Sequence, residues 1–202
     1  MNSPMRCSAI PSLSILKTRS SMPDLPQHRP VLAGARYSGM AAAGLRLEAL
    51  PEGHLLHVLG TIEPAALAAE LVKAGFTNSS IRKAGFRQWF VAGDEPLIPS
   101  GLEGLTAAIA GKAFVMDQSH GRVRIGVSGR SSRLLLSKGT AVDLDPTVFP
   151  EGQSAMTMVG HISVQIVRTG DDSFELTVLR SFGESLWDEL THMAESAEKD
   201  SA

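Results

Sequence analysis

The stretch "HISVQIVRTGDDSFELTVLRSFGESLWDEL", residues 161–190, places two alternating apolar segments and a helical segment in direct succession. The segments "HISVQIV" and "FELTVL" have the two-residue period of β-strands with one buried face. The polar, Gly- and Asp-containing segment "RTGDDS" between them is typical of a tight turn. The sequence therefore predicts an antiparallel hairpin at this point of the chain.

A helix with one apolar face is predicted directly after the hairpin. Ser181 and Glu184 have the spacing of a capping box, which begins a helix. The apolar residues that share one face at helical spacing are Phe182, Leu186, Leu190 and Met193, with Trp187 beside them. We expect this face to pack on the sheet that contains the hairpin.

The segment before the hairpin predicts another strand and a short helix. In "RVRIGVSG", residues 122–129, Val123, Ile125 and Val127 alternate with polar residues. This is the period of a strand that buries one face. Residues 129–139 then suit a short helix, which ends at Gly139 with Lys138 in its last turn.

The first half of the chain repeats the alternation of strands and helices. Residues 54–60, "HLLHVLG", predict a buried strand, and residues 64–75 predict a helix with proline in its first turn. Residues 86–93, "FRQWFVAG", predict a second strand. Residues 100–111 predict a second helix, which begins at a capping box formed by the first residue, a serine, and a glutamate three positions later.

This pattern favours an α+β fold with antiparallel or mixed sheets over a doubly wound parallel sheet, because at least one hairpin is present. We predict a Pro-rich, disordered tail over residues 1–35 and one domain over residues 36–202. Two interlocked strand-and-helix lobes, of about residues 45–112 and 113–196, divide that domain. The tail is open to other interpretations, namely a mitochondrial-type leader or a start codon placed too early.

The composition excludes several classes of function. The 202 residues carry a formal net charge of −2, which offers no broad positive field for nucleic acid or an anionic membrane. The chain has a single cysteine, so neither an intramolecular disulfide nor a cysteine-ligated metal site can form. Its apolar runs are far shorter than the roughly 20 residues that cross a bilayer. We expect a soluble, cytoplasmic protein.

The segment "SKGTAVDLDP", residues 137–146, has the appearance of a phosphate or metal site. A phosphate loop needs Lys before a helix, whereas this Lys-Gly pair ends one. Asp143 and Asp145 alone supply too few oxygen ligands for Ca²⁺. We interpret the segment as a helix end followed by an acidic surface corner.

Other catalytic patterns are equally weak. "DQSH" brings Ser119 and His120 together, but neighbouring residues in a strand point to opposite faces and cannot form a triad without a sharp turn. The six histidines lack metal-ligand spacing, and no Gly-rich dinucleotide fingerprint is present. The residues therefore suggest a subunit of a complex, a binding module, or an enzyme whose site lies in loops of no familiar pattern.

The second half of the chain resembles the γ subunit of heterotetrameric sarcosine oxidase. The resemblance is densest in "SKG" with "DLDPTVFP", in "GHISV", and in "FELTVLRSFGESLW". It is strong from residue 114 onward and looser over residues 30–113. Two positions differ from many relatives: Arg130 stands where they often have proline, and Thr140 stands where many have cysteine, which argues against thiol chemistry there.

The resemblance implies a fold like that of the folate-binding aminomethyltransferases of the glycine-cleavage system, and an oxidoreductase complex that acts on CH–NH donors. The family oxidises sarcosine to glycine with hydrogen peroxide and 5,10-methylenetetrahydrofolate. It carries FAD, FMN, NAD, tetrahydrofolate and zinc on the α, β and δ subunits. The chain itself is then expected to hold no cofactor or metal and no catalytic residue, and to have a structural role.

Three residues are candidates for contact with partner subunits: Arg122, Arg124 and Trp187. Arginines and large aromatic side chains are enriched at such contacts. Burial of Trp187 in the chain's own core is the alternative. For the function, the alternatives are the matching subunit of an N-methylglutamate dehydrogenase, a stand-alone folate-binding module and, least supported, a self-sufficient aminomethyltransferase, for which the chain is too short.

Overall fold

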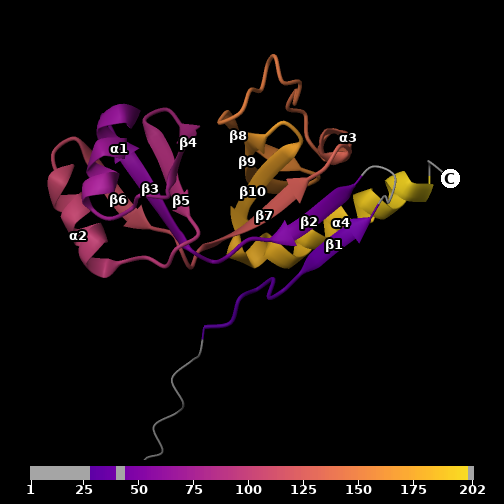
Figure 1. Cartoon of the computed structure of the whole chain (residues 1–202), viewed down its shortest axis with the longest axis horizontal. Coiled ribbons are helices and arrows are strands. Elements are labelled where there is room, and N and C mark those ends of the chain that lie inside the picture. Colours follow the sequence, from indigo (N-terminus) through magenta and orange to yellow (C-terminus); the bar gives the residue numbers. More distant parts are fainter. Residues whose placement is uncertain (1–27, 40–43, 200–202) are drawn as a thin grey trace, which may run out of the picture.

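A computed structural model describes residues 28–39 and 44–199 of the chain. Over these residues the protein forms two antiparallel sheets and four α-helices, which confirms the α+β prediction. The smaller sheet with its two helices lies beside the larger sheet, and the C-terminal helix runs along the larger one (Figure 1).

The smaller sheet has four strands in the order β4-β5-β3-β6. The strands are β3 (His54–Gly60), β4 (Ser80–Gly85), β5 (Gln88–Gly93) and β6 (Ala113–Asp117). Helices α1 (Pro64–Lys73) and α2 (Pro99–Ala108) cover one of its faces. The core between them contains Leu56, Val58, Leu67, Leu71, Val91, Leu105 and Ile109.

The larger sheet has six strands in the order β1-β2-β7-β10-β9-β8. The strands are β1 (Arg36–Gly39), β2 (Leu45–Ala49), β7 (Arg122–Ser128), β8 (Ser154–Val159), β9 (Ile162–Gly170) and β10 (Ser173–Leu179). Helix α3 (Ser132–Gly139), a 3₁₀ turn η1 (Arg180–Phe182) and helix α4 (Gly183–Lys199) complete this part.

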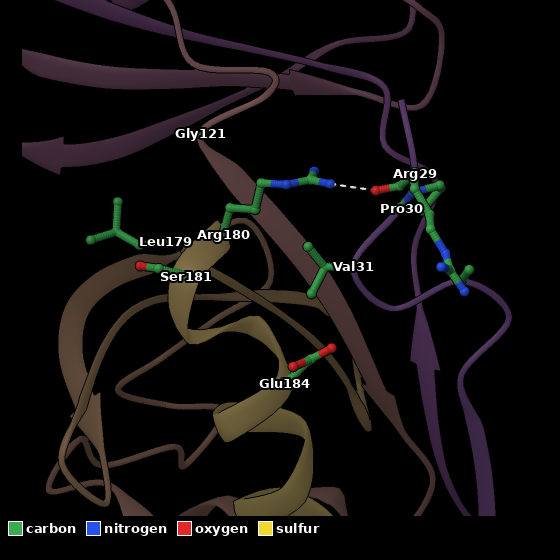
Figure 2. Close-up of a pocket in the computed structure, with 9 residues that line it drawn as sticks. Arg29, Pro30, Val31, Gly121, Leu179, Arg180, Ser181 and Glu184 are labelled. Carbon is green, nitrogen blue, oxygen red and sulfur yellow. Dashed lines mark hydrogen bonds between the residues drawn. The ribbon is translucent and has the colours of Figure 1, made fainter. Parts of the chain in front are cut away.

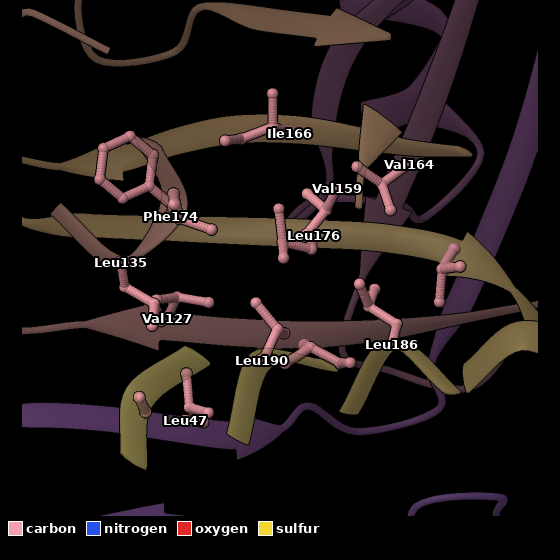
Figure 3. Close-up of a cluster of buried hydrophobic side chains, with 14 of the residues drawn as sticks. Leu47, Val127, Leu135, Val159, Val164, Ile166, Phe174, Leu176, Leu186 and Leu190 are labelled. Carbon is pink, nitrogen blue, oxygen red and sulfur yellow. The ribbon is translucent and has the colours of Figure 1, made fainter. Parts of the chain in front are cut away.

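Helix α4 packs on one face of the larger sheet and forms the main core. Leu186 and Leu190 are fully buried against inward side chains of β7, β9 and β10 (Figure 3). Each buried leucine of this kind contributes on the order of 2 kcal/mol through removal of apolar surface from water. The predicted β9–β10 hairpin and the helix after it are therefore confirmed.

Three details of the predicted helix starts are wrong. Ser181 lies within the 3₁₀ turn, and α4 begins at Gly183, so Ser181 is not at the cap position of that helix. Phe182 is 48% exposed, because it lies in the 3₁₀ turn before α4 and not on the apolar face of the helix. Helix α2 begins at Pro99, with Ile98 at the cap position and no side-chain cap hydrogen bond, so Ser100 does not cap it. Proline fits the first helical turn because its missing N–H would be unpaired there in any case.

The two sheets do not correspond to the two contiguous lobes that the sequence predicts. Strand β2 pairs with β7 in the larger sheet, although it lies at the start of the predicted first lobe. Strand β6 pairs with β3 in the smaller sheet, although it lies at the start of the predicted second lobe. Each sheet thus takes a strand from the other half of the chain, and the lobe limits as domain boundaries stay a prediction.

Part of the predicted tail belongs to the folded body. Leu32 is 9% exposed and joins the core of the larger sheet, and the backbone N–H of Val31 donates to Glu52. The tail prediction therefore does not hold for residues 28–35. Its remainder, residues 1–27, lies outside the described residues.

Candidate functional site

The faces of the two sheets that carry no helix meet through charged side chains. Arg82 on β4 donates from both terminal nitrogens to the two carboxylate oxygens of Glu175 on β10. The side chains of this pair are 5% and 8% exposed. A bidentate pair with so little access to water fixes the two sheets relative to each other.

Arg124 joins the same cluster from β7. It donates weakly to Glu175 at 3.5 Å, and to the carbonyl oxygens of Pro51 and Gly93 at 2.9 and 3.3 Å. Its second carboxylate partner is Asp94, which is largely exposed. Arg124 itself is 7% exposed, so it is a buried link between the sheets within one chain.

Arg122 lies beside this cluster but has different partners. Its guanidinium lies 4.7 Å over the ring of Phe90 on the smaller sheet. Its Nε is buried and has no hydrogen-bond partner among the described residues, and the same holds for the hydroxyl of Thr177 and the side-chain carbonyl of Gln165. These three unpaired atoms lie on the helix-free side of the larger sheet.

Burial lowers the pKa of two groups at the junction, the region where the helix-free faces of the two sheets meet. It lowers the pKa of Arg122 from its ordinary value. Burial also lowers the pKa of His57, with Arg122 adding to the decrease and a hydrogen bond with Gln88 opposing it. Both shifts mean that positive charge is poorly solvated here.

A hollow of about 980 Å³ lies where β10 leads into α4 (Figure 2). Its lining residues are Arg29, Pro30, Val31, Ala33, Gly121, Leu179, Arg180, Ser181 and Glu184. Figure 2 shows the guanidinium of Arg180 reaching across to the main-chain oxygen of Arg29, to which it donates a hydrogen bond. The hollow thus lies between the start of α4 and the segment that precedes β1.

Glu52 anchors that segment. Its carboxylate accepts hydrogen bonds from Arg180 at 3.1 Å and from the backbone N–H of Val31 at 3.2 Å, and it also contacts the ring of His28. Burial alone would raise the pKa of Glu52, but the bonds from His28, Arg180 and Val31 together lower it below its ordinary value. The carboxylate is therefore bound in its charged form.

Because its pKa is lowered, Glu52 is expected to make the free energy of unfolding depend on pH. A carboxyl whose pKa is lower in the folded protein contributes stability above the unfolded pKa of about 4.3, and that contribution is lost as the pH falls through the folded value. Glu52→Gln is expected to lower the free energy of unfolding by about 1–2 kcal/mol at neutral pH, and to flatten its decline in acid. Urea unfolding measured at neutral and acidic pH checks this prediction.

The matched control is Glu48→Gln, since Glu48 pairs with Arg36 at the surface. That change is expected to alter stability by less than about 1 kcal/mol. An equal pH profile for wild type and Glu52→Gln would contradict the role given to Glu52.

The three predicted contact residues do not lie together. Trp187 is half-buried and packs against the core of the larger sheet, on the helix-covered side. Arg122 and Arg124 lie at the junction on the opposite side of that sheet, with Arg124 engaged within the chain. Their contact with other subunits stays a prediction.

The acidic corner that precedes β8 is held together by its own backbone. Asp143 accepts the N–H of Asp145, and Asp145 in turn accepts the N–H and hydroxyl of Thr147. The hydrogen bonds from Thr147 lower the pKa of Asp145. Such turns need neither a metal nor a phosphate. At the end of α3, Thr140 shares a hydrogen bond of 2.8 Å with Thr157 on β8.

The "DQSH" segment is likewise structural. Ser119 donates its hydroxyl to Asp117 at 2.6 Å and accepts the N–H of Leu55 at 3.1 Å. His120 packs against the ring of His28 instead of Ser119. No serine–histidine pair of the kind that a triad needs is formed by these residues.

Sequence reasoning missed the carboxylates and one arginine of the junction: Arg82, Asp94 and Glu175. One signal was available, since Glu175 interrupts the apolar segment "FELTVL" on the face opposite to Phe174 and Leu176. A charge on the second face of a central strand indicates either solvent or a buried partner. The sequence alone did not distinguish these two.

Two structural features are absent from the described part of the chain. No helix there is long and apolar enough to span a membrane. Within the same residues, no group of three or more His, Cys, Asp or Glu side chains is arranged to hold a metal ion.

Comparison with known proteins places these features in context. The sequence model of the sarcosine oxidase, gamma subunit family matches residues 59–198. A chain of the heterotetrameric sarcosine oxidase from Corynebacterium sp. U-96, solved in complex with pyrrole 2-carboxylate, superimposes with a TM-score of 0.68 at 20% identity. This match covers 79% of the present chain and 88% of that chain, and it supports the two-sheet fold.

A second solved structure, the regulatory subunit of aspartate kinase from Thermus thermophilus, gives a TM-score of 0.46 at 15% identity. It covers 74% of the present chain and 95% of that chain. A search of curated protein sequences returns no match.

Proposed function

Because the chain belongs to the sarcosine oxidase gamma subunit family, we propose that it is the γ subunit of a heterotetrameric sarcosine oxidase and has a structural, noncatalytic role in that complex. The family match over residues 59–198 is the observation that carries the proposal. The α, β and δ subunits would hold the flavins, NAD, tetrahydrofolate and zinc. The complex would convert sarcosine to glycine, hydrogen peroxide and 5,10-methylenetetrahydrofolate.

The buried polar side chains support a structural role, because their hydrogen bonds join parts of the chain itself. The charged residues at the centre of the chain, Arg82, Arg124 and Glu175, are occupied in joining its two sheets. The hydroxyl of Ser119 donates a hydrogen bond to Asp117 within a turn. The likeness to aminomethyltransferases that the sequence resemblance implies is part of this proposal.

The surface of the chain also supports a role in assembly. Several large apolar side chains are exposed: Val72, Phe86, Ile98, Phe114, Met116, Leu134, Val148, Met156, Met158, Leu179 and Phe182. Where such side chains lie side by side, as Phe114 and Met116 do on one face of β6, exposed apolar surface is typical of contact with another chain. Partner subunits would remove part of it from water.

Purification of the tagged chain from its host tests the proposal. We expect three further subunits to copurify, together with the absorption spectrum of bound flavin. Addition of sarcosine under anaerobic conditions is expected to bleach the flavin, because the substrate reduces it. A colourless chain recovered without partners would contradict the proposal.

The same preparation distinguishes the alternatives. Bleaching by N-methylglutamate but not by sarcosine would assign the complex to the dehydrogenase class. A lone chain that binds tetrahydrofolate would instead indicate a stand-alone folate-binding module. The substrate and the assembly state are thus determined by one purification.

A further inference from the structure

Arg122 is a partly buried cation without a counter-ion in the described chain. Its Nε is buried and unpaired, and its guanidinium contacts the ring of Phe90. The two carboxylates at the junction, Glu175 and Asp94, are bound by other arginines. Glu52, which lines a small hollow together with Arg122, is likewise bound by another arginine.

Such a charge is energetically unfavourable until an anion reaches it. Removing a guanidinium from water is costly, and a nearby carboxylate with good geometry offsets that cost. The planar, multiply donating guanidinium suits a carboxylate in particular. His57, which neighbours Arg122, cannot serve as the counter-ion because imidazole carries no negative charge in either protonation state.

Exposed apolar side chains lie on the sheet faces that carry Arg122 and its neighbour His57. Leu179 is its register partner on the neighbouring strand β10 and is 42% exposed. On the smaller sheet, His57 is the register partner of Met116, which is 50% exposed, and Phe114 follows on the same face of β6 with 79% exposure. We call Arg122, His57, Phe114, Met116 and Leu179 the Arg122 patch.

We propose that the Arg122 patch is the docking site for a surface segment of a partner subunit that carries an Asp or Glu carboxylate beside a large apolar side chain. The carboxylate supplies the charge that Arg122 lacks, and the apolar side chain covers Phe114, Met116 or Leu179. Aromatic residues, methionine and arginine are the types enriched at the centres of protein interfaces. This inference rests on the proposed function, since it names the site through which the subunit assembles.

The variant Arg122→Met distinguishes an effect on partner binding from an effect on the stability of the chain. Methionine keeps an unbranched apolar side chain over Phe90 but removes the unpaired charge, so the isolated variant is expected to be at least as stable as wild type. Its affinity for the copurifying partner subunits is expected to fall about 30-fold or more, because a carboxylate in the partner is then left buried and unpaired. Arg36→Met, which removes a cation that is 77% exposed on β1, is the control and is expected to bind like wild type.

A photo-crosslinking residue in place of Phe114 identifies the occupant. Since Phe114 is largely exposed, the substitution is expected to leave the fold intact. We expect a crosslink to a partner-subunit peptide that contains an Asp or Glu. A crosslink to a second copy of the chain, or to a peptide without a carboxylate, would overturn the inference.

The two proposals fail differently in these experiments. If wild type recovers no partner subunit, both are wrong. If wild type recovers its partners and Arg122→Met binds them as tightly, only the docking site is wrong. Phe114→Ser provides a second binding measurement and is expected to weaken the complex without loss of stability.

Discussion

Replacement of Glu175 by alanine is expected to lower the free energy of unfolding by about 3–5 kcal/mol. The change leaves Arg82, which is 5% exposed, without its carboxylate and removes one of the two carboxylates near Arg124. A buried guanidinium without a counter-charge is far less favourable than the intact pair. Urea unfolding at neutral pH, followed by circular dichroism, measures the loss.

Two further variants make this prediction specific. Glu175→Gln keeps the shape and one acceptor oxygen but removes the charge, so its loss is expected to lie between those of wild type and Glu175→Ala. Glu48→Gln breaks an exposed pair with Arg36 and is expected to change stability by less than about 1 kcal/mol. A loss in Glu175→Ala no larger than in Glu48→Gln would show that the junction does not depend on this carboxylate.

The junction between the two sheets explains why several charged side chains of this chain are buried. The two helix-covered cores are separate, and among the described residues a small apolar cluster around Leu55, Phe90 and Ala92 is the only one between the sheets. Ion pairs with fixed geometry therefore determine how the sheets are oriented. The Arg122 patch contains residues of both sheets. A partner that contacts this patch therefore needs the relative orientation of the sheets to be fixed.

The sequence predicted the elements that are governed by local periodicity. Strands β3, β7, β9 and β10 and the helices were recognisable because their apolar residues repeat at two or about 3.6 positions. Strands β1, β2, β4, β6 and β8 were not predicted; β4 and β8 show why. In β4, "SIRKAG", a basic residue occupies a buried position. In β8, "SAMTMV", the two methionines are exposed. Neither strand therefore shows the alternation of buried apolar and exposed polar residues.

The site was less predictable than the fold because it depends on contacts between distant residues. Arg124 was selected as a candidate for contact with partner subunits, and its alternation with Val123 and Ile125 suggested a solvent-facing side. The smaller sheet covers that side, so Arg124 is buried on the second face of its strand. Arg82 and Glu175 are 93 positions apart in sequence, and no local pattern relates residues at that separation.

Leu190→Ala is expected to lower the free energy of unfolding by about 2–5 kcal/mol, because it deletes a fully buried side chain and leaves a cavity. Leu190 lies on α4 at the centre of the larger core, against side chains of β7 and β10 (Figure 3). The neighbouring side chains are fixed by sheet pairing on one side and by the helix on the other, so they can fill little of the cavity. Thermal and urea unfolding measure the loss.

Leu134→Ala is the matched control, since the same atoms are removed from a side chain that is 56% exposed on α3. Its loss is expected to be below about 1 kcal/mol. If both variants lost equal stability, the packing of α4 on the larger sheet would be wrong. A partner that binds only the folded state shifts the unfolding equilibrium toward that state. If Leu190→Ala is destabilised and the control is not, but Leu190→Ala still copurifies with partner subunits, the complex stabilises the folded chain in this way.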